Sequence, residues 1–325
     1  MKRYILGEPV QGFSHIHGNV ECQDSCKQVE LEDGAIVLSV ADGHGSKACP
    51  FSKNGSEIAV NVFCDKMSGI YSGYQSDPER LPSYLNHEGS LKFAQDMERD
   101  WKASVLEAHL AMKREMPLTA DGQEDFNAVY RMYGTTLLGL LIAPAFVFAF
   151  QLGDGDITYV DAQGAQPVVT GDKLLGVESH SLCSADAWKK AVSSVHLRNW
   201  DQVLPCVFML STDGFSNSFV NDEEFEKTCN QYFGMLNEYG AAAVKENLKS
   251  WLAETSRLGC GDDTTLLMAY FTDDVPEKLH ETEFQSNEMI PDGLCMEDTE
   301  GTEPVVLDDT KPIPETTDEV PEQEA

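Results

Sequence analysis

Short apolar runs that lie next to an aspartate recur along this chain, and they restrict its fold more than any other feature of the sequence. Each run is rich in Val, Leu or Phe and has the length of a buried β-strand. We expect strands at residues 35–41, 136–141, 145–152, 207–210 and 265–271. The aspartates that adjoin four of these runs are Asp42, Asp154, Asp213 and Asp262. A chain with several such strands has to bury them in a core built on β-sheet.

Three other segments carry apolar residues at three- and four-residue spacing, which is typical of amphipathic helices. We expect these helices at residues 56–67, 90–114 and 241–256. Residues 68–89 and 118–131 are rich in Gly, Ser, Asp and Asn, and we expect them to be surface loops. The strands and helices together predict one α+β domain over residues 1–272.

The composition of the chain changes after Phe271. Residues 273–325 contain 18 acidic and two basic residues, and so carry half of the net charge of −32 of the whole chain. Pro, Thr and Glu replace the apolar periodicity there, so the segment cannot bury enough surface to fold. We expect residues 273–325 to be an acidic, flexible C-terminal tail. An autoinhibitory or partner-binding tail, acting through the apolar patch at residues 304–307, is the alternative.

The excess of 55 acidic over 23 basic residues excludes two classes of partner. A surface this negative repels phosphate backbones and anionic lipid head groups, so we expect neither nucleic acid nor a membrane as partner. The most apolar run, 137–150, has 14 residues, fewer than the about 20 needed to cross a membrane. The N-terminus lacks the apolar stretch of a signal peptide, and the nine cysteines fit free thiols. These features predict a cytoplasmic protein.

Strands that assemble into one core could bring the four aspartates together at one edge. A single Asp-Gly pair is usually only a turn, but a cluster of carboxylates repels itself and favours a cation. Mg²⁺ and Mn²⁺ prefer such oxygen ligands. Two ions roughly 3.5–4 Å apart can turn a shared water into a nucleophile. The pattern therefore indicates hydrolysis of a phosphate ester.

His44 follows Asp42 by two residues, within Asp42-Gly43-His44-Gly45. Beside the metals, its imidazole could protonate the departing alkoxide as a general acid. A histidine in a Gly-rich turn is otherwise often a solvated or capping residue. No cysteine lies in a phosphate-binding loop that would activate it, so catalysis through a phospho-cysteine is not expected.

Six short motifs occur in a fixed order along the chain. They are Cys22-Gln23-Asp24-Ser25, Ala41-Asp42-Gly43-His44-Gly45, Gly134-Thr135-Thr136, Gly153-Asp154-Gly155, Thr212-Asp213-Gly214 and Asp262-Asp263-Thr264-Thr265. With these motifs the chain resembles the metal-dependent protein Ser/Thr phosphatases of type 2C over most of residues 7–271. The resemblance implies a four-layer αββα sandwich, in which two antiparallel β-sheets pack together and helices flank both outer faces.

The resemblance also implies two bound Mg²⁺ or Mn²⁺ ions, with a third that binds more weakly. By position in the motifs, Asp42 would bridge the first two ions and the carbonyl of Gly43 would bind the first. Asp213 and Asp262 would complete the second site. These ligands would hold a bridging water or hydroxide that attacks the phosphorus of phosphoserine or phosphothreonine.

Three further residues receive roles from the same resemblance. Asp24 would hold waters of the first metal site, and Asp154 would share the third metal with Asp213. His44 would act as the catalytic general acid. The substrates would be phosphorylated proteins, and a Ser/Thr kinase would be a partner.

Two positions depart from the family pattern. Asn19 stands where the family usually has an Arg that binds the substrate phosphate, and Asn has no charge with which to do so. Lys47 and His17 are the candidates to replace this Arg in binding the phosphate. A Ser14-His15 element precedes Asn19 in the sequence. Gln23 replaces a carboxylate of some relatives, which would weaken the first metal site.

Two other functions stay open at this point. The missing Arg favours a catalytically weak binding or scaffold module that keeps the fold, whereas the retained aspartates argue against it. A metal-dependent hydrolase of small phosphate esters on the same fold is the other alternative.

Overall fold

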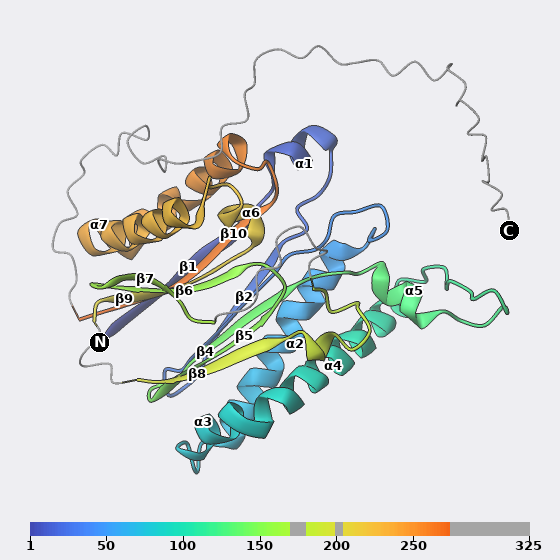
Figure 1. Ribbon diagram of the computed structural model, residues 1–325, viewed down its shortest axis with the longest axis horizontal. Helices are drawn as coiled ribbons and strands as arrows, with labels where there is room; N and C mark the ends of the chain where they lie inside the picture. The colour runs from blue at the N-terminus through green and yellow to red at the C-terminus, as the bar shows by residue number, and fades with distance from the viewer. Residues whose placement is uncertain (170–179, 199–203, 274–325) are drawn as a thin grey trace, which may run out of the picture.

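Two antiparallel five-stranded β-sheets pack against each other at the centre of the molecule (Figure 1). The computed structural model describes residues 1–169, 180–198 and 204–273. The first sheet contains, in spatial order, β1 (Lys2–Val10), β10 (Thr264–Thr272), β9 (Cys206–Ser211), β6 (Asp156–Asp161) and β7 (Gly164–Pro167). The second contains β2 (Ser25–Glu30), β3 (Ile36–Ala41), β4 (Leu137–Ile142), β5 (Phe146–Leu152) and β8 (Val192–Leu197). The predicted α+β sandwich is confirmed.

The central strands are buried on both faces of their sheets. In β3, Ile36, Leu38 and Val40 belong to the apolar layer between the two sheets, which also contains Phe208 of β9. Val37, between them in the sequence, belongs to the apolar layer on the opposite face of the same sheet. This alternation follows the two-residue period of a strand. Because both faces are covered, these strands are continuous apolar runs in the sequence.

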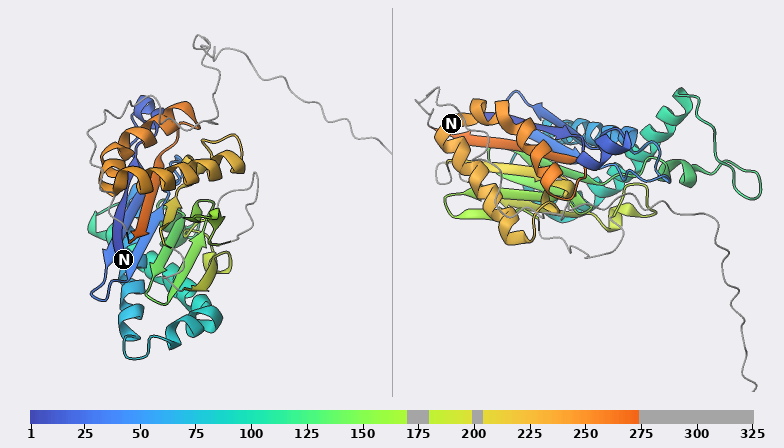
Figure 2. Two further views of the ribbon diagram at one scale, coloured as in Figure 1. Left: turned by 90° about the vertical axis from the view of Figure 1, so that its left-hand side faces the viewer. Right: turned by 90° about the horizontal axis from the view of Figure 1, so that it is seen from above.

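Helices cover the outer face of each sheet (Figure 2). The second sheet is covered by α2 (Ser52–Gly73) and α4 (Ser90–Ala111), and the first by α7 (Asp222–Leu258), which is kinked at Gly240. Phe63 of α2 is fully buried, and its ring lies against β4. The helices therefore cover the outer faces of both sheets, whereas the ends of the strands stay accessible and can form a site.

The sequence-based expectation of a loop at residues 68–89 is wrong for most of its length. There α2 continues to Gly73, and α3 (Arg80–Tyr84) and a π-helical turn (Leu85–Gly89) follow. Leu81 and Leu85 are buried in the apolar layer under α2 and α4. Tertiary packing of these two side chains therefore overrides the local preference for a loop.

Further elements are not predicted by the sequence patterns. Within the expected loop 118–131, α5 (Phe126–Arg131) forms, and the Asp125 side chain caps it by accepting the Ala128 N–H. The remaining short helices are α1 (Phe13–Gly18), α6 (Asp213–Ser216) and a 3₁₀ turn (Ala187–Lys189). The unpredicted strands are β1, β2, β6, β7 and β8, whose residues are in part exposed and so lack a continuous apolar run.

The two ends of the described domain lie together. Lys2 of β1 pairs with Thr272 of β10, and the N-terminal ammonium is 3.0 Å from the Asp273 carboxylate. The predicted acidic tail, residues 273–325, lies outside the described residues from position 274 onwards, so this division of the chain stays a prediction. None of the described helices combines the length and the apolar composition needed to cross a membrane.

Candidate metal centre

An open cleft of about 290 Å³ lies where strand ends of both sheets meet. Residues from distant parts of the sequence line it. Those predicted for the site are Asp42, Gly43, His44, Asp154, Asp213 and Asp262, and the others are His15, Gln23, Gly45 and Ser46. Asp42 follows β3 directly, Asp213 begins α6 after β9, and Asp262 precedes β10. The structure thus brings together all four of the aspartates that adjoin the apolar runs.

The loop after β3 is held in place by the Gly134-Thr135-Thr136 motif. Thr135 Oγ1 donates a hydrogen bond to the Asp42 carbonyl (2.7 Å), and Thr136 Oγ1 accepts one from the Asp42 N–H (3.0 Å). The His44 N–H donates to the Gly134 carbonyl (3.1 Å). A Cβ at Gly134 would lie 2.6 Å from His44 Cδ2, so any side chain there would displace the His44 ring. The motif therefore fixes the backbone of Asp42 and the position of the His44 ring.

Two aspartates of the cleft, Asp213 and Asp42, have raised pKa values, so their anionic forms are disfavoured. Burial, and then the charges of Asp154 and Asp262, raise the pKa of Asp213 to about 7. Loss of contact with water raises the pKa of Asp42 well above its usual range, and the surrounding carboxylates raise it further. Among the described residues that line the cleft there is no Lys or Arg. A cluster of this kind is stabilised by a bound cation.

Asp24 lies beneath the cleft and does not line it, because only 1% of the residue is exposed. Thr212 and Thr265 donate hydroxyl hydrogen bonds to its Oδ2, at 2.8 and 2.6 Å. Its Oδ1 is buried and has no hydrogen-bond partner within the described part of the chain. Burial raises the pKa of Asp24 to about 7, although the two threonine hydroxyls oppose the shift. A buried carboxylate oxygen without a protein partner is suited to an ion or to its ordered waters.

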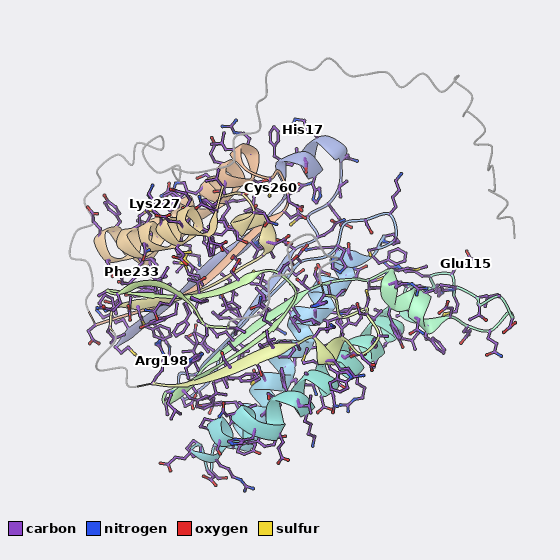
Figure 3. The ribbon with its side chains drawn as sticks, viewed as in Figure 1. His17, Glu115, Arg198, Lys227, Phe233 and Cys260 are labelled. Carbon is purple, nitrogen blue, oxygen red and sulfur yellow. The ribbon has the colours of Figure 1, made fainter. Side chains whose placement is uncertain are left out.

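The residues predicted to replace the phosphate-binding Arg do not line the cleft. Lys47 is exposed on the loop after His44. Asn19 is exposed and follows α1 in the left-handed conformation, with φ of 53°. His17 lies on the outer side of α1 (Figure 3), where its ring packs against Phe13 and its Nδ1 is 2.8 Å from the Phe13 carbonyl oxygen.

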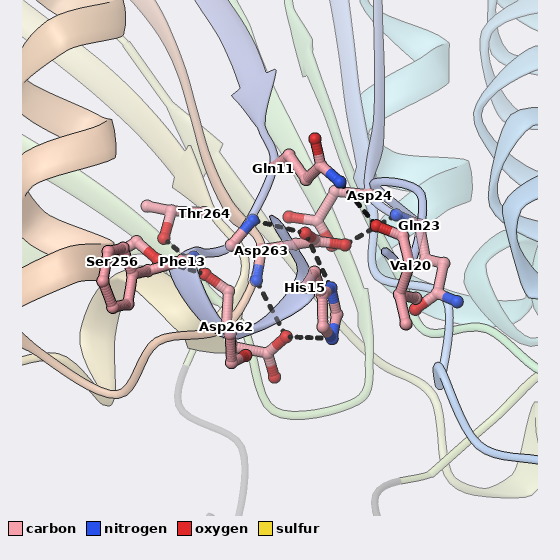
Figure 4. A network of polar contacts seen from close by, with 12 residues as sticks. Gln11, Phe13, His15, Val20, Gln23, Asp24, Ser256, Asp262, Asp263 and Thr264 are labelled. Carbon is pink, nitrogen blue, oxygen red and sulfur yellow. Dashed lines mark hydrogen bonds and ion pairs between the residues drawn. The ribbon is translucent and has the colours of Figure 1, made fainter. Parts of the chain in front are cut away.

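His15 is a cleft residue to which the sequence patterns assign no role. Its Nδ1 lies 2.9 Å from Asp263 Oδ1, and its Nε2 lies 3.5 Å from Asp262 Oδ1 (Figure 4). Asp263 is buried and also accepts the N–H groups of Gly12 (2.7 Å) and Gln23 (2.6 Å). The one signal that the sequence offers is the Ser14-His15 element ahead of the first motif, and that element alone does not indicate what His15 contacts.

Solved structures share the fold at low sequence identity. A Streptococcus agalactiae serine/threonine phosphatase matches with a TM-score of 0.52 and 15% identity, over 83% of this chain and 99% of that chain. The Mycobacterium tuberculosis phosphatase PstP matches with a TM-score of 0.50 and 13% identity, over 84% and 100%. The PstP catalytic domain in complex with two manganese ions has a TM-score of 0.50 and 14% identity, over 83% and 99%.

Comparison at the level of sequence families gives the assignment. No match was found among curated proteins. The family model of protein phosphatase 2C matches residues 11–253, which is most of the described domain and includes five of the six motifs. The chain belongs to the protein phosphatase 2C family.

Proposed function

We propose that this chain is a metal-dependent phosphatase that hydrolyses phosphoserine and phosphothreonine in proteins. The observation that supports this most is the convergence of Asp42, Asp154, Asp213 and Asp262 in one open cleft, together with His44. Membership in the protein phosphatase 2C family supports the same activity. A catalytically weak binding module is not favoured, because such a module would not need to keep these mutually repelling side chains together.

The side chains of the cleft fit divalent cations. Burial and neighbouring carboxylates raise the pKa values of Asp42, Asp213 and Asp24, and Asp24 Oδ1 is buried without a protein partner among the described residues. Carboxylate and carbonyl oxygens are the ligands that Mg²⁺ and Mn²⁺ prefer. We assign two such ions, with a third that binds more weakly, to the ligands Asp42, Gly43 carbonyl, Asp213, Asp262 and Asp154, and we assign to Asp24, beneath them, the binding of waters of the first metal site. The two manganese ions of PstP are consistent with this assignment.

Bound cations would supply two effects that the side chains cannot supply. They would lower the pKa of a bound water so that it is deprotonated at neutral pH, and they would neutralise the charge of the phosphate. The chain itself would position the leaving group and its proton. His44 lines the cleft, and its backbone is held by the Gly134 carbonyl. Its imidazole would give a proton to the departing serine or threonine oxygen. This transfer matters because an alkoxide is a poor leaving group.

The proposed substrates and surroundings follow from this activity. The cleft is open, and its described lining offers few groups besides the candidate ligands and His44. Few groups are therefore left to recognise a small molecule, and we infer that the substrates are phosphorylated proteins. A Ser/Thr kinase that supplies these substrates would be the partner. We also propose a reducing, cytoplasmic compartment, because all eight cysteines of the described residues are free thiols.

Hydrolysis of a phosphothreonine peptide tests the proposed function. Wild-type protein should release phosphate with Mn²⁺ and not with EDTA. Asp213→Asn should lose the activity, whereas the matched control Asp65→Asn, an exposed residue of α2, should keep it. A small aliphatic phosphate ester should be a poorer substrate than the peptide. Metal-independent turnover, or full activity of Asp213→Asn, would refute the proposal.

A further inference from the structure

His15 is held against the cleft by a rigid network. The Ser14 N–H and the Ser14 hydroxyl both donate to the Gly261 carbonyl, at 2.9 and 2.7 Å. The Phe13 N–H donates to Ser256 Oγ at 2.9 Å. These bonds attach α1 to the end of α7 and to the loop before β10. The position of the His15 ring over the cleft is therefore fixed by the fold.

The contact with Asp263 determines which ring nitrogen of His15 carries the proton. Asp263 already accepts two backbone N–H groups, as an ionised carboxylate does, so it acts as an acceptor toward His15 as well. The Nδ1 of His15 is then the donor of the 2.9 Å hydrogen bond. In the neutral imidazole the other nitrogen, Nε2, has a lone pair and no proton.

The free nitrogen of this ring faces a second carboxylate. Nε2 lies 3.5 Å from Asp262 Oδ1, an oxygen that accepts the Asp263 N–H (2.8 Å) and keeps a second lone pair for another partner. Two ligands that each lie about 2.1 Å from one ion, at an angle between 90° and slightly over 110°, are separated by about 3.0–3.5 Å. The observed separation fits a cation held between the two atoms. Asp263 is buried and does not line the cleft, and its Oδ1 accepts both the Gly12 N–H and the His15 Nδ1–H, so it fits the role of a supporting residue rather than a ligand.

We infer that His15 Nε2 is a metal ligand that acts together with Asp262, with Asp263 orienting the imidazole. Metal-binding histidines characteristically donate their other N–H to a carboxylate, as His15 does here. This inference rests on the metal centre of the proposed function. It adds a nitrogen ligand to a set that otherwise consists of oxygens. Because Mg²⁺ is bound through oxygen and transition-metal ions also accept imidazole, His15 shifts the preference of the site from Mg²⁺ toward Mn²⁺.

Pulsed electron paramagnetic resonance of the full-length chain loaded with Mn²⁺ tests the inference. A directly bound imidazole gives the Mn²⁺ signal a modulation from ¹⁴N, which changes when the histidines are labelled with ¹⁵N. We expect this modulation in the wild type and in the matched control His17→Gln, which lies on the same short helix but outside the cleft. We expect its loss in His15→Gln. Calorimetric titration should show Mn²⁺ affinity lowered about tenfold or more in His15→Gln, and Mg²⁺ affinity lowered less.

The possible results separate this inference from the proposed function. Bound Mn²⁺ without nitrogen modulation in the wild type, or a modulation that persists in His15→Gln and disappears in His44→Gln, overturns the role of His15 and leaves the phosphatase intact. Unchanged Mn²⁺ affinity with a raised KM in His15→Gln overturns it in favour of contact with the substrate phosphate. Absence of any Mn²⁺ binding to folded protein overturns both.

Discussion

Replacing Asp24 by Asn should change how the stability of the metal-free protein depends on pH. The pKa of Asp24 is about 7 in the folded protein, against 3.8 for an ordinary aspartate. Between these values the folded state binds a proton that the unfolded state lacks. The contribution of Asp24 to the free energy of unfolding of the wild type therefore falls as the pH rises from 3.8 to 7, and stays at its lower value above pH 7. Asn does not titrate and can still accept the hydroxyl hydrogen bonds of Thr212 and Thr265.

The size of this effect follows from the shift. Each pKa unit corresponds to about 1.4 kcal/mol, so the two units between pH 5 and pH 7 amount to about 3 kcal/mol. Relative to the wild type, Asp24→Asn should thus gain about 3 kcal/mol in the free energy of unfolding between pH 5 and pH 8. Any effect of Asn on packing adds the same amount at both pH values and cancels in this difference.

Denaturation by urea, in EDTA, at pH 5 and at pH 8 measures the difference directly. The exposed control Asp65→Asn should change its stability relative to the wild type by less than about 0.5 kcal/mol between the two pH values. An equal difference between Asp24→Asn and the wild type at pH 5 and pH 8 would refute the reasoning. So would a variant that loses stability relative to the wild type as the pH rises.

Further predictions concern the metal, the proton donor, the loop that holds it and the core. Mn²⁺ at one fixed concentration, 100 times its Kd at pH 8, should stabilise the protein by about 2.7 kcal/mol at pH 8. At the same concentration the increase in Tm should be smaller at pH 5, because protons compete for Asp42 and Asp213. An increase in Tm that is larger at pH 5 would contradict this. His44→Gln should lower kcat on a phosphothreonine peptide by about 10²–10⁴-fold, and much less on an aryl phosphate whose leaving group needs no proton; equal losses on both substrates would exclude a general acid. Gly134→Ala should lower kcat by about 10²-fold, because its Cβ would displace the His44 ring, while Mn²⁺ affinity measured by calorimetry should change little. Phe63→Ala should cost about 3–5 kcal/mol in urea denaturation, since the ring is fully buried between α2 and β4, and a cost below 1 kcal/mol would contradict the described packing.

The core strands could be predicted from the sequence because nearly every residue in them is buried and apolar. All six residues of β3 are buried, so the apolar run is continuous and its limits are close to those of the strand. The edge strand β8 carries no such signal, and Leu197 at its end is 78% exposed. The helical turns around Leu81 and Leu85 also escape prediction, because only contacts with distant helices favour them over a loop.

The same distinction applies to the site. The aspartates that end apolar strands, such as Asp42 and Asp213, could be predicted to converge because a sheet brings strand ends together. The pair of His15 and Asp263 joins residues 248 positions apart, and no local spacing indicates it. The motif around Asp24 does not predict that this residue is buried. Its position depends on hydroxyl groups from β10 and from the turn after β9.

The account depends most on the claim that the cleft between the two sheets is a centre for two metal ions. Anomalous diffraction at the manganese absorption edge, from crystals of the chain grown with Mn²⁺, tests that claim directly. We predict two strong peaks in the cleft, the first bounded by Asp42 and the Gly43 carbonyl, and the second by Asp42, Asp213 and Asp262. Peaks confined to the outer surface, or an empty cleft in crystals saturated with Mn²⁺, would contradict the account.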